Sequence, residues 1–191
     1  MSVRSHPKFK RKKVIVFAFE GKNNKTEKMY FSHFKPSDDD YILKTFSSGV
    51  TDIKNMIDST KAKRKEYDYH ANEDITYIFV DADADNNKLK QIRDYKSKQP
   101  NDIHIIISNP TFEIWFLNHF IRTNKEMTNS QLLVEISKHL IDYSKNVDYF
   151  EILEGKIEKA ISNSKFQMGQ GNDNPISEVV SLFEDNIIVK K

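Results

Sequence analysis

The sequence contains no cysteine among its 191 residues. Disulfides, thiolate ligands for a metal ion and a cysteine nucleophile are therefore excluded, and this composition is typical of a reducing compartment. Glycine and proline are scarce, with 5 of each, which favours a chain rich in helices. Long apolar runs are also missing. We expect no membrane span, because none of the runs approaches the roughly 20 apolar residues that one requires.

A secretion signal is not expected either. The basic start of the chain is followed by a short apolar run, residues 14–19, which ends at Glu20. A signal peptide has a longer apolar region and a small-residue cleavage site. We therefore expect a cytoplasmic protein.

Charge is nearly balanced, with 30 Lys and Arg against 28 Asp and Glu and a net charge of +2. The basic residues are nevertheless clustered. The clusters are interpreted either as patches that attract phosphate backbones or as a solvated tail and a helix C-terminus that favours cations. The two clusters are Arg4, Lys8, Lys10, Arg11, Lys12 and Lys13 in the first segment, and Lys61, Lys63, Arg64 and Lys65 near the end of an expected helix.

Continuous runs rich in Val, Ile and Phe predict strands that are buried on both faces. Between and after these strands, apolar residues recur at helical spacing. The expected strands are 13–19, 41–46, 75–80 and 103–107, and the expected helices are 25–34, 50–67, 87–98, 111–121, 129–143, 149–164 and 176–183, with a loop at 169–174.

Strands that alternate with helices predict an α/β fold with a mostly parallel four-stranded sheet, flanked by helices and followed by a C-terminal helical extension. We expect a basic arm at 1–12 and a single domain at 13–191, with the sheet core at 13–121 and the helical part at 122–191. Asn109 suits a helix cap and Pro110 the first helical turn.

Acidic and polar residues follow the expected strands. Glu20 ends the first strand, Asp81, Asp83 and Asp85 follow the third, and Ser108 and Asn109 end the fourth, with Glu113 one turn into the next helix. Ligands of open α/β sheets bind beyond the carboxyl ends of the strands. If the first and third strands are neighbours, about 4.8 Å apart, Glu20 and Asp81 can share one ion.

Crowded carboxylates stay ionised at low cost only around a cation. Oxygen ligands favour Mg²⁺ or Mn²⁺, and these segments lack the His or Cys ligands of zinc. Such an ion leaves positions for water and phosphate oxygens, which is the arrangement used in phosphoryl transfer and nuclease chemistry.

Other known metal-binding and nucleotide-binding motifs do not match these residues. An EF-hand loop starting at Asp81 fails, because Asn86 and Ile92 replace its required Gly and Glu. The phosphate-loop and dinucleotide-binding glycine patterns are absent. A solvated loop with a helix-capping Asp stays open, and Glu27 and Glu113 also suit the first turns of helices without any other role.

The aromatic residues of 112–120 have helical spacing and predict core packing. These residues are Phe112, Trp115, Phe116 and Phe120. His119 on the same helix and His104 in the fourth strand are expected to be structural.

Several motifs together resemble one family. They are Glu20-Gly21 with Thr26-Glu27 and Tyr30-Phe31, then Phe79-Val80-Asp81-Ala82-Asp83, then Ser108-Asn109-Pro110-Thr111-Phe112-Glu113-Ile114-Trp115 with His119-Phe120, and last Asn174-Pro175-Ile176-Ser177-Glu178-Val179-Val180. In this order they resemble the motifs of the RloB-like proteins. Compared with the motifs of that family, this chain has two additional residues between Gly21 and Thr26 and one additional acidic residue, Asp85.

The resemblance implies a Toprim-like (Rossmann-like) fold in which Glu20, Asp81 and Asp83 bind Mg²⁺, with general acid or base as the alternative role of Glu20. It also implies an antiviral defence role, RNA, tRNA or DNA as target, and a partner ATPase of the AAA or ABC type, RloA. We assign catalysis to Glu20, Asp81, Asp83 and Glu113, metal binding to Glu20, Asp81, Asp83 and Asp85, and nucleic-acid contacts to Arg4, Lys8, Lys10, Arg11, Lys12, Lys22 and Lys25, with Glu27, Ser108 and Asn109 as weaker candidates.

Three functions follow as hypotheses. The first is a Mg²⁺-dependent nuclease, and the second is a catalytically inactive module that docks on an ATPase or on nucleic acid. The third is a phosphatase or nucleotidyl transferase that acts on a small nucleotide, although a phosphate-loop motif for it is missing.

Overall fold

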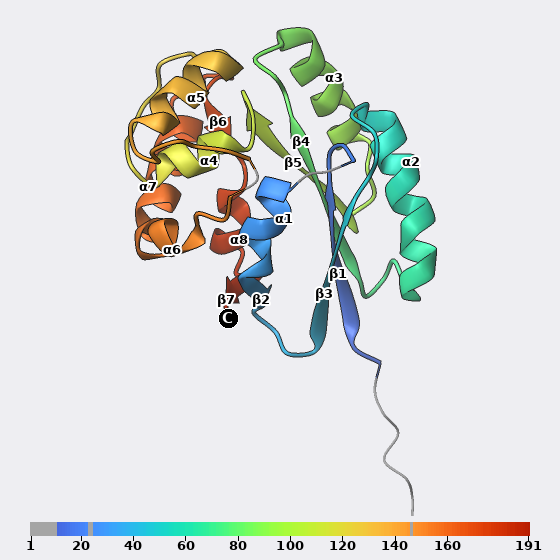
Figure 1. Cartoon of the computed structure of the whole chain (residues 1–191). Coiled ribbons are helices and arrows are strands. Elements are labelled where there is room, and N and C mark those ends of the chain that lie inside the picture. Colours follow the sequence, from blue (N-terminus) through green and yellow to red (C-terminus); the bar gives the residue numbers. More distant parts are fainter. Residues whose placement is uncertain (1–10, 23–24, 146) are drawn as a thin grey trace, which may run out of the picture.

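The computed structural model describes residues 11–22, 25–145 and 147–191. Its main feature is a five-stranded sheet with helices on both faces (Figure 1). The strands are β1 (Lys13–Phe19), β2 (Phe34–Pro36), β3 (Tyr41–Ser47), β4 (Ile75–Asp81), β5 (Ile103–Asn109), β6 (Ile176–Ser177) and β7 (Ile188–Lys190). The helices are α1 (Lys25–Ser32), α2 (Ile53–Arg64), α3 (Asn86–Ser97), α4 (Glu113–Asn118), α5 (Asn129–Ser137), α6 (Phe150–Leu153), α7 (Ile157–Gly169) and α8 (Val180–Glu184), with short 3₁₀ turns at Lys65–Tyr67 and Glu154–Lys156.

The strand order in the main sheet is β3-β1-β4-β5-β6. The first four strands are parallel, and β6 pairs with β5 in the antiparallel direction. The order confirms that the first and third predicted strands are neighbours. β6 is an addition to the four strands predicted, and β2 and β7 form a separate antiparallel pair.

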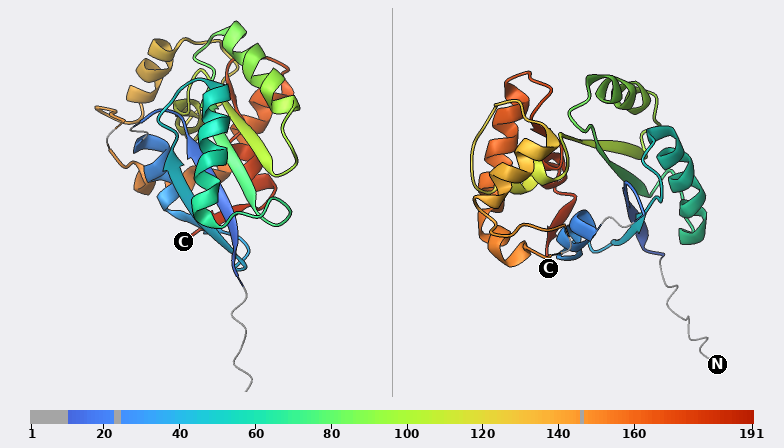
Figure 2. Two further views of the ribbon diagram at one scale, coloured as in Figure 1. Left: turned by 90° about the vertical axis from the view of Figure 1, so that its right-hand side faces the viewer. Right: turned by 45° about the horizontal axis from the view of Figure 1, so that its top comes forward.

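Alternate side chains of β1 enter two separate apolar clusters, as the two-residue period of a strand requires. Val14, Val16 and Ala18 face α2 and α3, while Ile15 and Phe17 face α1 and the helical part. Figure 2 shows α2 and α3 on one side of the sheet and the helices of the C-terminal half on the other.

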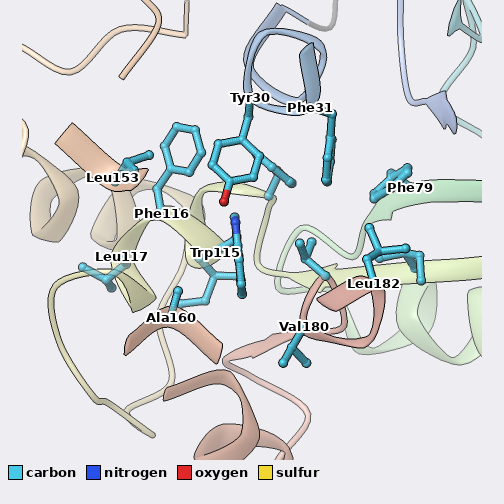
Figure 3. Close-up of a cluster of buried hydrophobic side chains, with 14 of the residues drawn as sticks. Tyr30, Phe31, Phe79, Trp115, Phe116, Leu117, Leu153, Ala160, Val180 and Leu182 are labelled. Carbon is cyan, nitrogen blue, oxygen red and sulfur yellow. The ribbon is translucent and has the colours of Figure 1, made fainter. Parts of the chain in front are cut away.

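The core on the second side joins the sheet to the helical part. Tyr30 and Phe31 of α1, Phe79 of β4 and Trp115 of α4 pack together with residues of α6, α7 and α8 (Figure 3). Trp115 and Phe116 are buried as expected, and His119 is fully buried. In the parts of the chain that the structure describes, no helix combines the length and the apolarity that a membrane crossing requires.

The segment after β5 differs from the prediction. Asn109 is the last residue of β5 and Pro110 follows it through a cis peptide bond, so α4 begins only at Glu113, with Phe112 at its cap position. The predicted Asn cap is wrong because the Asn109 side chain is used elsewhere. It accepts a hydrogen bond from the Ala84 amide at 3.0 Å and donates one to the Asp173 carbonyl at 2.6 Å.

Other boundaries are also shorter than predicted. The helix expected at 129–143 ends at Ser137, and the helix expected at 176–183 is divided into β6 and α8. The Ile176 backbone is not helical because it pairs with Asn109 at the sheet edge. The segment predicted at 149–164 is broken at the 3₁₀ turn around Gly155 before α7 begins.

Candidate functional site

The carboxyl ends of β1 and β4 bring two predicted residues into direct contact. Glu20 follows β1 and Asp81 ends β4, and these strands are neighbours in the sheet. The backbone N–H of Asp81 donates a hydrogen bond of 3.1 Å to Oε2 of Glu20. Burial is the main cause of the raised pKa of Glu20. The predicted meeting of these two residues at one edge of the sheet is therefore confirmed.

Asp81 is surrounded by acidic side chains from separate elements. Burial raises its pKa well above the ordinary value, and the negative charges of Glu27, Glu113 and Glu20 raise it further. Glu27 lies in the first turn of α1 and Glu113 in the first turn of α4, and both are buried. The two weaker candidates of the sequence thus belong to the same group of carboxylates, which we call the acidic cluster: Glu20, Glu27, Asp81 and Glu113.

Glu113 contacts three side chains within the acidic cluster's surroundings, those of Thr111, Tyr143 and Lys145. Its Oε2 accepts a hydrogen bond of 2.6 Å from the Thr111 hydroxyl, and its Oε1 accepts one of 3.1 Å from the Tyr143 hydroxyl. The ammonium group of Lys145 lies 2.9 Å from the same Oε1. Burial and the nearby Glu113 charge raise the pKa of Tyr143, so this phenol remains a donor.

Lys145 brings positive charge to the acidic cluster. Burial lowers its pKa, but the negative charges of Glu113, Asp81 and Glu27 outweigh burial, and the pKa is raised overall. The backbone carbonyl of Lys145 accepts a hydrogen bond of 3.2 Å from the Thr26 hydroxyl. The loop after α5 is therefore joined to both α1 and α4 at the site.

Asp83 lies beside the acidic cluster and is bound to a second lysine. Its Oδ2 is 2.6 Å from the ammonium of Lys88, which also lies 3.4 Å from Oε1 of Glu20. Its Oδ1 accepts a hydrogen bond of 3.0 Å from the Asn129 side chain. Lys88 thus joins the two segments that the sequence predicted to share an ion.

The backbone of the Asp-Ala-Asp segment is held in a tight loop. Asp83 and Ala84 both have a φ of 56°, which is uncommon for residues other than glycine. The Asp83 amide donates to the Pro110 carbonyl at 2.7 Å, and the Ala82 amide donates to the Ser108 carbonyl at 2.8 Å. Ser108 and Asn109 therefore position this loop through hydrogen bonds.

Asp85 is the cap of α3. Its Oδ1 accepts hydrogen bonds from the amides of Asn87 at 2.8 Å and Lys88 at 3.1 Å. This contact is the capping alternative that the sequence left open, and it gives the carboxylate a structural role at the helix start. Metal binding by Asp85 stays a prediction.

The donor chemistry of the acidic cluster fits a hard divalent cation. All of its side chains offer carboxylate oxygens, which are the ligands that Mg²⁺ and Mn²⁺ prefer. Burial raises the pKa of Asp81 most, and the negative charges of Glu27, Glu113 and Glu20 raise it further, so a cation at this place would be favoured. Within residues 11–22, 25–145 and 147–191, however, no group of three or more His, Asp or Glu side chains has an arrangement that could hold a metal ion.

The basic residues are divided between two ends of the sheet. Arg4, Lys8 and Lys10 lie outside the described residues. Arg11 pairs with Glu73 at 3.0 Å and with Asp74 at 3.1 Å, near the start of β1. Because β1 has 7 residues, its start is about 20 Å from Glu20.

Lys22 is exposed one residue after Gly21, at the same end of the sheet as Glu20, and Lys25 is the first residue of α1. In the second basic cluster, Arg64 pairs with Asp102 and lies over the Tyr69 ring at 3.5 Å. Of the predicted contacts to nucleic acid among the described residues, Lys22 thus lies at the same end of the sheet as the acidic cluster.

Four residues at the site were not predicted from the sequence: Lys88, Asn129, Tyr143 and Lys145. Lys88 carried one usable signal, since it lies in the first turn of a predicted helix, where the dipole disfavours a cation. Tyr143 and Lys145 come from a loop that is 30 or more residues from Glu113, and no local pattern indicates such a contact.

The family model of the RloB-like proteins matches residues 15–185, from the third residue of β1 to the residue after α8. No curated protein and no solved structure matches the chain. The motifs that resembled this family include Glu20, Asp81 and Glu113, which the fold brings together. The chain therefore belongs to the RloB-like protein family.

Proposed function

We propose that this protein is a divalent-metal-dependent nuclease that hydrolyses phosphodiester bonds in RNA, tRNA among them, or in DNA. The observation that carries the proposal is the acidic cluster at the carboxyl ends of β1 and β4, where the Asp81 amide lies 3.1 Å from Glu20 and where burial, followed by the charges of Glu27, Glu113 and Glu20, raises the pKa of Asp81. A purely structural site gains nothing from such repulsion, whereas a cation among these carboxylates relieves it. The proposal includes a Toprim-like fold.

In this proposal, Glu20, Asp81 and Asp83 hold Mg²⁺ or Mn²⁺, which supplies an activated water and stabilises the leaving oxygen. The Asp81 amide fixes the orientation of the Glu20 carboxylate by its hydrogen bond of 3.1 Å. If Glu20 is not a ligand, the same carboxylate is placed to accept a proton. Glu113 contributes through its contacts, because it holds the ammonium of Lys145 at 2.9 Å.

Two lysines supply the contacts that an anionic substrate requires. Lys88 and Lys145 both lie among carboxylates, and in each case the pKa is raised, so both remain cationic at neutral pH. A phosphate that enters the site meets ammonium groups able to donate to its oxygens. Lys22 and the basic residues before β1 are proposed to contact the backbone farther from the reacting phosphate.

The test compares two isosteric variants with matched controls. Asp81→Asn and Glu20→Gln remove one negative charge each, while Asp94→Asn and Glu126→Gln make the same changes at exposed positions. Purified proteins are incubated with single-stranded RNA, tRNA and plasmid DNA in Mg²⁺ or Mn²⁺. We expect the site variants to lose cleavage by about 100-fold or more, and the controls to match the wild type.

Equal cleavage by the site variants and the wild type would contradict the proposal. Circular dichroism and the unfolding midpoint of each variant show whether the fold is retained. Chelation of the metal is expected to abolish cleavage, and added Mn²⁺ is expected to restore it.

A non-catalytic binding module is the second candidate, and one observation favours it. Lys88 contacts both Asp83 and Glu20, so these charges are partly neutralised without a metal ion. This candidate predicts no hydrolysis with any metal but stable binding of nucleic acid or of an ATPase. Retained RNA binding by a wild-type protein that cleaves none of the substrates would favour it over the nuclease.

A role in antiviral defence under the control of a partner ATPase of the RloA type is part of the proposal, as is a cytoplasmic location. Co-expression of the chain with an ATPase encoded beside it tests the partnership. We expect the two proteins to co-purify, and we expect toxicity in cells that depends on Asp81. Toxicity of the Asp81→Asn variant equal to that of the wild type would contradict a nuclease effector.

A further inference from the structure

A cavity of about 300 Å³ lies between the start of α2 and the first turns of α3. Ile53, Val80 and Ile92 line it and are buried, so they form an apolar floor. Thr51, Asp52 and Gln91 line it from exposed positions and form a polar rim. We call this cavity the α2–α3 pocket. Its volume is at the lower end of the range for small-ligand sites.

The α2–α3 pocket adjoins the acidic cluster. Lys88 lines the pocket and also lies 2.6 Å from Asp83 and 3.4 Å from Glu20. Val80 on the floor directly precedes Asp81 in β4. The Lys88 side chain therefore connects the pocket with the carboxylates of Asp83 and Glu20. Figure 2 shows α2 and α3 side by side on this face of the sheet.

The rim offers hydrogen-bonding groups without partners. Neither the Gln91 amide nor the Thr51 hydroxyl makes a hydrogen bond within the described residues. An amide can both donate and accept, and a hydroxyl can do the same. Asp52 adds a negative charge at the rim, which disfavours a phosphate there. The pocket therefore suits a neutral ligand that has an apolar surface for the floor and hydrogen-bonding groups for the rim, which a nucleobase combines.

We propose that the α2–α3 pocket receives the nucleobase of the nucleotide next to the phosphodiester at the acidic cluster. This inference rests on the proposed nuclease function and adds a specificity site to it. The base lies against Ile53 and Ile92, its edge meets Gln91 and Thr51, and the adjoining phosphate lies on the Lys88 side. Because the base must leave its stack to enter, the substrate is single-stranded at that nucleotide.

The binding test uses the isoleucine methyl groups of the whole chain as reporters. Each of the four ribonucleoside 5′-monophosphates is added to ¹³C-methyl-labelled protein in EDTA, and inorganic phosphate is added to a separate sample. We expect saturable shifts at Ile53 and Ile92 with at least one nucleotide, and none at Ile136, which is buried in the other core cluster. Shifts produced equally by inorganic phosphate, or no shifts at Ile53 and Ile92, would overturn the proposal.

Two substitutions of Gln91, at the rim of the α2–α3 pocket, test whether the nucleotide binds there. Gln91→Ala is expected to weaken nucleotide binding about tenfold through the lost hydrogen bonds, and Gln91→Trp is expected to abolish the methyl shifts by filling the pocket. Gln170→Ala changes an exposed glutamine at the end of α7 and should bind like the wild type. Unchanged binding by both Gln91 variants would overturn the assignment.

The cleavage assay separates this proposal from the nuclease proposal. With oligonucleotides that differ in one base, the wild type should prefer one base, and Gln91→Ala should reduce that preference about tenfold. If the wild type cleaves nothing but shows the methyl shifts, the nuclease proposal is wrong and the pocket is still a nucleotide-binding site. If the wild type cleaves normally, with no base preference and no methyl shifts, only the proposal for the α2–α3 pocket is wrong.

Discussion

At Asp81, the arrangement that we propose for metal binding lowers the stability of the metal-free folded protein at neutral pH. Its carboxylate is crowded by Glu27, Glu113 and Glu20, and its pKa is raised well above the ordinary value of 3.8. The folded chain therefore holds a proton on Asp81 at pH values where the unfolded chain has released it. By linkage, this group contributes most stability below pH 3.8, and the contribution is lost as pH rises through the raised pKa.

The first prediction is that Asp81→Asn stabilises the metal-free protein at neutral pH. The amide has no charge to repel the other acids, so the loss of stability with rising pH should be weaker than in the wild type. Urea unfolding midpoints between pH 4 and pH 8 in EDTA measure the difference. Asp94→Asn, at an exposed position, should follow the wild type. A lower midpoint for Asp81→Asn at pH 7 would contradict the prediction.

His119 has the opposite pH dependence. Burial lowers its pKa from 6.5 to about 4, and the ring is fully buried beside Trp115 and Tyr30. Its Nδ1 lies 2.8 Å from the Trp115 carbonyl. Because a carbonyl only accepts, Nδ1 carries the proton and the neutral ring is satisfied there. The role of His119 is structural, as the sequence predicted.

The second prediction concerns that histidine. Its pKa is lowered on folding, so the stability that it contributes is complete above pH 6.5 and is lost as pH falls toward 4, by about 3 kcal/mol over the window. His119→Gln should remove this dependence, although the variant will be less stable throughout. Midpoints at pH 4.5, 5.5 and 7 measure the slope, and His139→Gln, at an exposed ring, is the control. An unchanged slope in His119→Gln would refute the assignment.

At the scale of the element, α3 links the capping aspartate to the site. Asp85 accepts hydrogen bonds from two amides of the first turn, and Lys88 in that turn reaches Glu20 and Asp83. The position of the lysine therefore depends on how the helix begins. Asp85 has two assigned roles, a helix cap in the structure and a metal ligand in the sequence analysis, and substitutions separate them.

The third prediction compares Asp85→Ser with Asp85→Ala. Serine is a good cap but a poor ligand, so Asp85→Ser should keep the stability of the wild type, whereas Asp85→Ala should lose about 1 kcal/mol. Urea unfolding measures the stability, and titration with Mn²⁺ measures metal affinity. If Asp85 is only a cap, metal affinity stays the same in Asp85→Ser. A loss of affinity in this variant would restore Asp85 as a ligand.

Elements that bury a continuous apolar run were predictable from the sequence. The bounds of β1 match the prediction residue for residue, and the neighbouring positions of β1 and β4 placed Glu20 and Asp81 together. Strands of two or three residues were not predictable, because β6 and β7 exist only through partners far along the chain. For the same reason the contacts of Tyr143 and Lys145 were not predictable, because these residues reach Glu113 from a loop far along the chain.

At the scale of the whole molecule, the chain does not separate into a sheet part and a helical part. One apolar cluster contains Phe17 of β1 and Tyr30 of α1 together with Leu132 of α5 and Val180 of α8. β7, at the C-terminal end, pairs with β2 in the first half of the chain (Figure 1). The acidic cluster lies where these parts meet, since Glu20 follows β1 and Asp81 ends β4, while Lys145, which pairs with Glu113, comes from the helical part.

The last prediction is that the protein unfolds in one cooperative transition. Trp115, the single tryptophan, is fully buried in the shared core and stacks on Phe183 of α8, with the ring centroids 5.3 Å apart, so its fluorescence reports the contact between α4 and the helical part. Far-UV circular dichroism also reports α2 and α3, which pack on the other face of the sheet. A single folding unit requires that both signals share one midpoint in urea.

Removal of β7 extends the same test, because its pairing with β2 connects the two halves of the chain. Deletion of residues 187–191 should lower both midpoints by the same amount, because it destabilises the single core that the sheet and the helical part share. Separate midpoints in the wild type, or a deletion that moves the fluorescence midpoint alone, would show that the helical part unfolds independently. Lys145 would then leave the acidic cluster without global unfolding, and metal binding would not protect the helical part.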